Sequence, residues 1–487
     1  MQDTSRVSQP ARTHIVIGNG ITALAFVEQC ALSRGDTLIV LGERARQLGR
    51  GAAYAKGEAG TPWRYAYLLN SPADDIDPVF AGWLQARWPD ITQTMTGRAP
   101  RWLDAAGPLV AAGDIQGVNA PREFYGDFME EQAEVAFAAL AEAGVTVRIV
   151  EDMGISVSRA DGRLVVETAA SGPLHADSVD IAPGGPSTLR IDGDDGAFAV
   201  PAVFGHEHQI AEHIRAGREI VCIGGNAAML DVLRLCQSLL PEDEIKFTAI
   251  APDGEIPEPL IPRLPRRITK PELGTGHATA ESLLDTIEAE ISRARAEGDE
   301  QREIRAGFRA HFLAHPLHLH LSDPEEAKRV PAHLRFWLRG GTRDTILDMR
   351  RLVDGGTARM VQGFVTGIAH GDDGATVLVR GPNGDEHEVA AGFVVNCAGA
   401  GPGSVFDPVT EDLLEQGHIT RCPVSKGLTV GPGCRTGLPG VRHLSPATTV
   451  IGEEVMAMPL YDAHMLRTYV ERAGSPGADH ESAHGKP

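Results

Sequence analysis

The chain has 487 residues, of which 42% are hydrophobic, so it is long and apolar enough for two or more domains with buried cores. Its net charge of −21 argues against nucleic acid or an anionic membrane as the main partner. No apolar stretch reaches the roughly 18 residues that span a membrane, and Met1 to Arg12 lacks the apolar core of a signal peptide. We therefore expect a soluble, cytoplasmic protein that acts on a small molecule, with homo-oligomer formation left open.

Residues Thr13 to Glu43 have the layout of a dinucleotide-binding βαβ unit. An apolar strand leads into a G-x-G-x-x-A turn and a helical stretch, and a second strand ends at an acid, which favours this unit over an ordinary glycine-rich turn. Gly18 permits the tight turn, Gly20 lets the backbone approach a pyrophosphate and is a candidate for positive φ, and Ala23 allows close packing. The acid would accept ribose hydroxyls. The predicted cofactor-binding residues are Gly18, Asn19, Gly20, Thr22, Ala23 and Glu43.

The same pattern recurs from Arg218 to Val232, where an apolar strand precedes a small-residue turn and a helix start. Gly224 and Gly225 open this turn, and Asn226 stands where the second glycine is expected. Asparagine tolerates a left-handed backbone, but its Cβ crowds a pyrophosphate. Two interpretations stay open: a site for NAD(P)H at these three residues, or a structural relic that has lost its ligand.

A second internal similarity supports a duplicated architecture. In each half, short segments typical of antiparallel strands precede a strand that ends in small residues, and a turn signal separates them. The first set is Val147 to Glu151, Leu164 to Thr168 and Ser178 to Gly185, with the turn Ala160-Asp-Gly; the second is Ala358 to Gln362, Ala375 to Arg380 and Gly392 to Ala400, with the turn Pro382-Asn-Gly.

These patterns predict an α/β fold with two Rossmann-like dinucleotide-binding domains, antiparallel β-meanders and a helical insertion. We expect a first FAD-type domain at residues 1–190 that is completed by 401–472, and a second, nicotinamide-type domain at 191–400. The insertion would occupy about residues 265–355, after a proline-rich connection at 252–270, and residues 473–487 would form a disordered tail.

The predicted insertion contains His311, His315, His318 and His320. A histidine pair at i and i+4 can chelate zinc. However, Pro316 follows the pair directly and no H-E-x-x-H motif accompanies it. We therefore favour a packed or surface histidine cluster over a metal site.

Cysteine usage bears on the reaction class. The six cysteines, at positions 30, 222, 236, 397, 422 and 434, include no C-x-x-C pair. A flavin disulfide reductase normally needs two thiols close enough to exchange with its flavin, so this reaction class is disfavoured. Cys222 and Cys397 lie in apolar strand patterns and are expected to be inert core residues.

A group of motifs resembles those of bacterial FAD/NAD(P)-binding proteins related to flavin-dependent N-hydroxylating monooxygenases. The resemblance spans about Thr13 to Val470, and the combination is more specific than any single motif. The motifs are Gly18-Asn-Gly-Ile-Thr-Ala, Gly49-Arg-Gly-Ala-Ala-Tyr, Tyr67-Leu-Leu-Asn-Ser-Pro, Phe80 to Leu84, Arg122-Glu-Phe-Tyr-Gly and Val395-Asn-Cys-Ala-Gly.

The resemblance implies a bound FAD, with its pyrophosphate on Gly18 to Ala23 and its ribose on Glu43. The Gly49-Arg50-Gly51 loop and the Leu69-Asn70-Ser71 segment would approach the flavin ring. Asn70 would offer a donor and an acceptor, or would be only a turn residue before Pro72. Arg50 would pair with a phosphate or a substrate carboxylate, or would be an exposed loop arginine.

The sequence also departs from the wider flavin monooxygenase pattern. The usual Gly-Asp pair for the ribityl chain is not evident, and backbone groups near Ser445 to Ala447 are the replacement that we predict. After the predicted strand Ile245 to Ile250 no arginine is placed for a 2′-phosphate, while Asp253 favours a free ribose hydroxyl. NADH is therefore expected to be at least equal to NADPH, unless an arginine such as Arg263 or Arg266 reaches the phosphate.

The leading hypothesis is an FAD-dependent, NAD(P)H-using monooxygenase that oxidises a nitrogen of an amine or amino-acid-like molecule. The alternatives are an FAD-dependent dehydrogenase or oxidase with a degenerate nicotinamide domain, and a non-enzymatic flavin sensor. The oxidising power would belong to the flavin, so the chemistry requires no acid/base dyad, and none is readable from the sequence.

Overall fold

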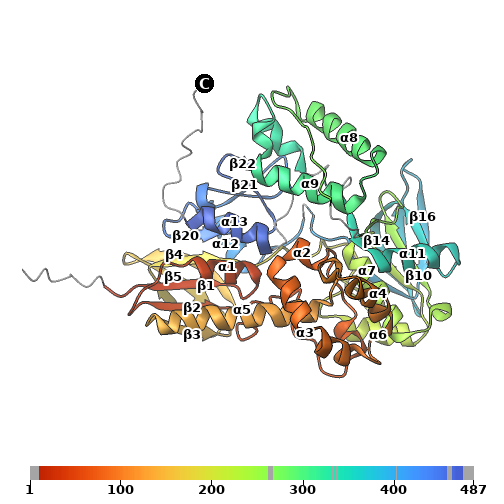
Figure 1. The fold of residues 1–487 in the computed structure, drawn as a ribbon, viewed down its shortest axis with the longest axis horizontal. Coiled ribbons are helices and arrows are strands. Elements are labelled where there is room, and N and C mark those ends of the chain that lie inside the picture. The colour runs from red at the N-terminus through yellow and green to blue at the C-terminus, as the bar shows by residue number, and fades with distance from the viewer. Residues whose placement is uncertain are drawn as a thin grey trace, which may run out of the picture.

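The first sheet has five parallel strands in the order β20-β7-β1-β2-β3 (Figure 1). The computed structural model describes residues 10–261, 267–331, 334, 338–401, 403–457 and 463–474. The central strands are buried over nearly their whole length, as expected for a parallel sheet that is covered on both faces. The strands are β1 (Thr13–Ile17), β2 (Thr37–Leu41), β3 (Thr146–Val150), β7 (Ser178–Ile181) and β20 (Val441–His443).

The second sheet repeats this plan, with five parallel strands in the order β13-β10-β9-β17-β8. In each sheet the strand that precedes the small-residue turn is central, the next strand in sequence pairs on one side, and a later strand pairs on the other. The α/β class with two Rossmann-like domains is therefore confirmed. The strands are β8 (Ala199–Val200), β9 (Ile220–Ile223), β10 (Phe247–Ala251), β13 (Ala358–Gln362) and β17 (Phe393–Asn396).

Each half also carries a three-stranded antiparallel meander. The segments Val147 to Glu151 and Ala358 to Gln362, which we expected within these meanders, instead fall on the parallel strands β3 and β13. Both lie at sheet edges and are partly exposed, so their burial pattern resembles that of a one-sided antiparallel strand. The meander strands are β4 (Gly154–Ala160), β5 (Arg163–Thr168) and β6 (Leu174–Ala176), then β14 (Phe364–His370), β15 (Ala375–Arg380) and β16 (Glu386–Ala391).

Helices cover both sheets. In the first half, α1 packs against α13 and α5, and their apolar residues form one core with the strands. The helices of this half are α1 (Ile21–Gln29), α2 (Ala73–Ile76), α3 (Pro78–Met95), α4 (Pro100–Ala111), α5 (Arg122–Glu142), α12 (Pro408–Glu415) and α13 (Ala463–Gly474). Since α13 runs to residue 474, the predicted tail begins slightly later than 473, and residues 475–487 lie outside the described residues.

The second sheet is covered by α6 (Glu207–Arg215), α7 (Ala227–Leu239) and α11 (Arg343–Asp354). Ile346, Met349 and Leu352 of α11 belong to the core of this sheet. The helical insertion that we expected to reach residue 355 therefore ends before α11. The domain boundaries at residues 190 and 400 stay predictions, although the strands of the two sheets fall within the expected ranges.

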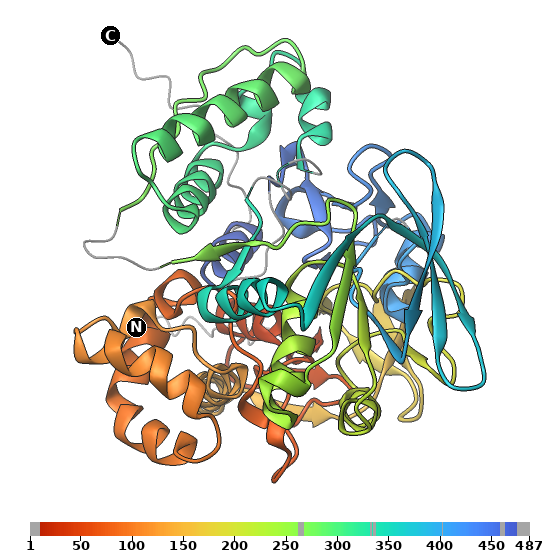
Figure 2. The ribbon, with the colours of Figure 1, turned by 90° about the vertical axis from the view of Figure 1, so that its right-hand side faces the viewer.

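The insertion consists mainly of α8 (Ala280–Ala296) and α9 (Gln301–Ala314), each of which begins with a capping box. It packs on a small sheet of the C-terminal segment and shares a core with it, so it covers the first half although it interrupts the second in sequence (Figure 2). That sheet contains β18 (Thr420–Arg421), β19 (Leu428–Val430), β21 (Thr448–Ile451) and β22 (Glu454–Val455). In the proline-rich connection, β11 (Glu258–Leu260) pairs with β12 (Gly340–Thr342). None of the helices that the structure describes is long and apolar enough to cross a membrane.

Candidate dinucleotide and flavin site

The first turn, Gly18–Ala23, follows β1 and begins with a residue that only glycine suits. Gly18 has φ +118°, and a Cβ there would collide with the carbonyl oxygen of Ala182. Gly20 is the N-cap of α1 and has φ −89°, so the expectation of positive φ at Gly20 is wrong. A Cβ at Gly20 would lie 3.4 Å from Cα of Gly51, an ordinary contact, so only a side chain larger than that of alanine would crowd the Gly49–Gly51 loop.

The N-terminus of α1 fits an anionic pyrophosphate. No side chain caps it, and its first turn contains no acid. Thr22 and Ala23 are buried against the sheet, while the amide of Asn19 donates to the carbonyls of Arg44 and Gln47 and fixes the turn to the loop after β2. These contacts support the predicted roles of the turn as a whole.

Glu43 lies just past the end of β2, beside the first turn, and is exposed. Within the described part of the chain its carboxylate has no ion pair or hydrogen bond. It is therefore free to accept the hydrogen bonds of a ribose, and this role stays a prediction.

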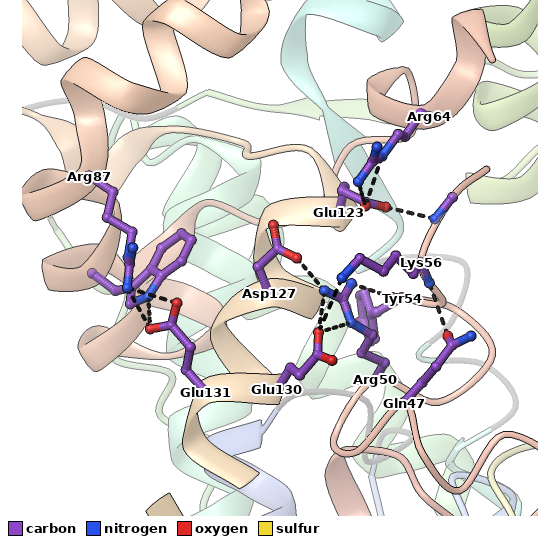
Figure 3. A network of polar contacts seen from close by, with 12 residues as sticks. Gln47, Arg50, Tyr54, Lys56, Arg64, Arg87, Glu123, Asp127, Glu130 and Glu131 are labelled. Atoms are coloured by element: carbon purple, nitrogen blue, oxygen red, sulfur yellow. Dashed lines mark hydrogen bonds and ion pairs between the residues drawn. The ribbon is translucent and has the colours of Figure 1, made fainter. Parts of the chain in front are cut away.

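Arg50 requires a correction, because it is neither an exposed loop residue nor available to a phosphate. Its side chain is 0% exposed, and its guanidinium binds Asp127 and Glu130 of α5, the latter at 2.9 Å from Nε (Figure 3). It also donates to the carbonyl of Tyr54. Arg50 therefore fastens the Gly49–Gly51 loop to α5 and places Gly51 against Gly20.

A hollow of about 450 Å³ lies beside this network, between α3 and α5. Trp83 and Arg87 of α3 both donate to Glu131 at its wall (Figure 3). Five carboxylates and two cations, Lys56 and Arg87, line this hollow, so its net charge is negative and it does not favour the phosphates of a dinucleotide. The carboxylates are Asp90, Asp127, Glu130, Glu131 and Glu134.

Asn70 lies in a segment that contacts both halves of the protein. The carbonyl of Leu69, the preceding residue, accepts hydrogen bonds from Asn119 Nδ2 and from Thr342 Oγ1 of the second half, both at 3.0 Å. Asn70 Oδ1 is buried and has no hydrogen-bond partner among the residues that the structure describes. An unpaired buried acceptor is costly, so this atom fits a donor that a bound flavin ring would supply. Its place before Pro72, the N-cap of α2, also agrees with the turn interpretation.

A buried ion network that sequence analysis missed holds this segment. Asp231 of α7 lies 2.8 Å from Arg122 of α5 and 3.0 Å from Arg234, and both arginines donate to the carbonyl of Leu68. Burial raises the pKa of Asp231 and lowers that of Arg234 to about 10. Asp231 and Arg234 pair within α7, but no local motif marks the network, because Arg122 and the carbonyl of Leu68 join it only when the two halves pack.

The second turn, Gly224–Met229, copies the first in its opening residue. Gly224 has φ +114°, and a Cβ there would collide with the carbonyl oxygen of Cys397. Asn226 is the exposed N-cap of α7 with φ −116°, so the left-handed conformation that we considered for it does not occur. The N-terminus of α7 has no side-chain cap and no acid in its first turn, which fits an anion. Gly225 is closely packed, since its Cβ would lie 2.9 Å from that of Ala251.

The expectation that no arginine stands near the end of β10 is wrong. Arg339 Nη1 lies 2.9 Å from Asp253 Oδ2, and Arg339 also donates to the carbonyl of Glu255. This cation is 86 residues away in sequence, and it neutralises the acid on which the NADH preference rested. Arg263 and Arg266 lie outside the described residues.

The turn at Ser445 to Ala447 is satisfied within the protein. Ser445 Oγ donates to the carbonyl of Gly184 at 2.6 Å and accepts from the backbone N–H of Ala447 at 3.2 Å. The carbonyl of Ala447 accepts from Leu428, and that of Ser445 accepts from Thr448. These contacts do not support the predicted role of this turn in holding the ribityl chain.

The histidine cluster brings two rings together. His311 Nε2 and His320 Nε2 are 3.3 Å apart, and His320 Nδ1 contacts the carbonyl of Gly274. Burial, with the neighbouring histidines, lowers the pKa of His311 to about 4. Among the residues that the structure describes, no group of three metal-ligating side chains converges here or elsewhere.

All six cysteines are free thiols, and Cys222 and Cys397 are buried as predicted. Burial and the adjacent Cys397 raise the pKa of Cys222 well above its ordinary value. A thiol that resists ionisation does not exchange with disulfides, so Cys222 is inert.

Comparisons with known proteins agree with this architecture. Residues 15–186 match the family model described as FAD-NAD(P)-binding. The FAD-bound cadaverine monooxygenase of Erwinia amylovora has a TM-score of 0.53 at 12% identity, and the match covers 96% of this chain and 95% of that one. A lysine monooxygenase of Nocardia farcinica has a TM-score of 0.48 at 16% identity, with 94% and 99% covered.

Thioredoxin reductase of T. acidophilum has a TM-score of 0.41 at 11% identity, with 95% and 97% covered. No curated protein matches the sequence. Identities this low show likeness of fold alone. Residues 15–186 therefore form a dinucleotide-binding domain of the FAD-NAD(P)-binding type, and the chain as a whole has the fold of a flavoprotein with two dinucleotide-binding domains.

Proposed function

We propose that the protein is an FAD-dependent monooxygenase that uses NAD(P)H and oxidises a nitrogen atom of an amine or amino-acid-like molecule. The observation that carries this proposal is Asn70, an unpaired buried acceptor in a segment held by residues of both dinucleotide units. A flavin ring there would lie where the two units meet, which is where a reduced nicotinamide must reach it.

The flavin would supply the oxidising chemistry when bound. The protein would hold its pyrophosphate at the uncapped N-terminus of α1, bind its ribose at Glu43 and orient its ring through Asn70. The Leu68 and Leu69 carbonyls are fully engaged by Arg122, Arg234, Asn119 and Thr342. This keeps the segment rigid and excludes water from its backbone.

The comparisons support the substrate class. One solved structure with a similar fold and nearly full coverage is a cadaverine monooxygenase bound to FAD. Six free cysteines, none in a disulfide, together with a need for reduced nicotinamide, favour the cytoplasm as the compartment.

A second candidate is an FAD-dependent dehydrogenase or oxidase whose second unit is only a scaffold. One observation favours it: Asn226 adds an exposed side chain at the second turn, which reduces the room for a nicotinamide dinucleotide.

Turnover of the FAD-loaded protein under air distinguishes these functions. We would measure NADH and NADPH oxidation, oxygen uptake and hydroxylamine formation with cadaverine, putrescine, L-lysine and L-ornithine. Product formed in proportion to nicotinamide consumed supports the monooxygenase. Amine-dependent flavin reduction without nicotinamide supports the dehydrogenase or oxidase, and a flavin-loaded protein with no turnover supports a sensor.

A further inference from the structure

Helix α9 of the insertion has two chemically different faces. Ile304, Phe308 and Phe312 point into the core shared with α8. Arg302, Arg305 and Arg309 are spaced by three and four residues, so they form one stripe on another face of the helix. Figure 1 shows α9 between α8 and α2.

The first arginine of the stripe is neutralised by α2. Arg302 is 4% exposed, and its Nη2 lies 3.2 Å from Asp74 and 2.6 Å from Asp75. Arg309, at the other end, contacts Met465 Sδ of α13 at 3.4 Å. The stripe therefore faces α2 on one side and α13 on the other.

Arg305, between these two, has no ion pair or hydrogen bond within the described part of the chain. Its side chain is half-buried, and burial lowers its pKa although Asp75 opposes this shift. It is also close enough to Arg309 for the two charges to repel, which helps to lower the pKa of Arg309 to about 10. A cation that is partly desolvated, unpaired and beside another cation is unfavourable unless an anion joins it.

The stripe lies next to the candidate flavin segment. Asn70 is followed by Ser71 and Pro72, and α2 starts at Ala73 and carries the two aspartates that hold Arg302. One short stretch of chain thus presents an unpaired acceptor for the flavin and a support for the arginine stripe. Arg305 lies one helical turn, about 4.5 Å of rise, from Arg302.

We propose that Arg305 binds the carboxylate of the substrate, which makes amino acids and other amine carboxylates, rather than simple diamines, the substrate class. A guanidinium binds a carboxylate through two parallel hydrogen bonds, which would both neutralise Arg305 and orient the amine. This inference rests on the proposed function for its reaction but not for its binding test. A phosphate of FAD or of a nicotinamide nucleotide is the other source of an anion, and the experiment separates the two.

The test measures binding to the FAD-loaded protein by calorimetry. The probes are two pairs that differ only by a carboxylate, L-lysine with cadaverine and L-ornithine with putrescine, together with inorganic phosphate and NADP⁺. The variants are Arg305→Met, which removes the charge at similar length, and Arg305→Lys, which keeps it. Arg293→Met on α8 is the matched control, since it removes an exposed arginine from a helix of the same insertion.

We expect at least one amino acid to bind the wild type about tenfold or more tightly than its diamine. Arg305→Met should abolish this difference, Arg305→Lys should keep part of it, and Arg293→Met should leave it unchanged. Without ligand, Arg305→Met should melt at the same temperature as the wild type or higher, because an unpaired cation is removed. A purely structural role would instead lower the melting temperature of this variant.

Equal affinity for both members of each pair, or amino-acid binding that survives Arg305→Met, would overturn the inference. The inference would also be overturned if none of the carboxylates bound, or if Arg305→Met lost its FAD. The same holds if Arg305→Met lost affinity only for phosphate and NADP⁺. Carboxylate-selective binding without any hydroxylated product would refute the proposed function and leave this site standing. Hydroxylation of diamines as efficiently as amino acids would support the proposed function and refute the inference about Arg305.

Discussion

The first and second turns have the same backbone geometry, but the acids that follow the two units differ in whether a cation neutralises them. Gly18 and Gly224 each pass a carbonyl of a neighbouring strand, of Ala182 and of Cys397, so closely that no side chain fits. Both turns then deliver a helix N-terminus without a side-chain cap. The geometry of an anion site was thus retained in both units.

Glu43 and Asp253, the acids that follow the second strand of each unit, have different surroundings. Glu43 is exposed and without a partner in the described part of the chain, whereas Asp253 is paired with Arg339. A free carboxylate suits ribose hydroxyls, while a paired one brings a cation to the place of a 2′-phosphate. We infer from this difference that the turn would fix where a dinucleotide lies and that the distant Arg339 would set which nucleotide is preferred.

The largest expected effect is the loss of FAD from the first unit. Gly20→Val should remove FAD, because the new side chain would enter the contact between Gly20 and Gly51 that shapes the pyrophosphate approach. Flavin absorbance of the purified protein checks this, with Gly82→Val as the control because a Cβ at that position meets nothing within 4 Å. Flavin at wild-type stoichiometry in a folded Gly20→Val variant would sink the assignment of this turn.

The second expected effect is acid sensitivity of the first sheet. Burial lowers the pKa of His443 in β20 from 6.5 to about 4. The unfolded chain then binds the proton first as pH falls, so this contribution to stability is complete above pH 6.5 and is lost toward pH 4. The loss would be on the order of 3 kcal/mol in the free energy of unfolding.

Urea unfolding between pH 7 and pH 4 measures this effect. His443→Gln should flatten the acid loss, and the exposed His387→Gln of the second unit should not. An equally steep loss in both variants would show that other groups are responsible.

A smaller effect concerns the choice of nicotinamide nucleotide. We expect the wild type to use NADH and NADPH within a factor of about ten, because Asp253 and Arg339 balance each other. Asp253→Ser should free the guanidinium and shift the ratio about tenfold toward NADPH, roughly 1.4 kcal/mol. Arg339→Ala should shift it the other way.

Stopped-flow flavin reduction with each nucleotide measures this ratio. Asp243→Ser, which removes a charge elsewhere in the second half, is the control. A ratio that Asp253→Ser and Arg339→Ala both leave unchanged would remove this pair from the nucleotide site.

The smallest expected effect comes from a substitution that makes the second turn more like the first. Asn226→Gly should tighten reduced-nicotinamide binding by about threefold, on the order of 0.6 kcal/mol, since it removes the Cβ that crowds the helix N-terminus. Titration of the oxidised protein with NADP⁺ and NAD⁺ checks this. Slower flavin reduction by the glycine variant would show that Asn226 contacts the nucleotide.

The sequence predicted what depends on local pattern. The two sheets, the positions of both turns and the steric demand at Gly18 follow from strand periodicity and small residues that lie close together in the chain. The contacts of Arg50 with Asp127, of Asp231 with Arg122 and of Arg339 with Asp253 could not be predicted in this way, because each joins residues that lie 77 or more positions apart in sequence. An arginine can bind either a ligand or a protein carboxylate, and the sequence does not show that Arg50 is buried against Asp127 and Glu130.

The carbonyls of Leu68 and Leu69 tie the first unit to the second. They belong to the first unit but are bonded by Arg234 and Thr342 of the second. A fragment cut at residue 190 would remove one of the two donors of each carbonyl and the Asp231 partner of the Arg122 guanidinium. The first unit is therefore not a portable FAD module, and a chimaera that exchanges the second unit must keep Asp231, Arg234 and Thr342 in register with it.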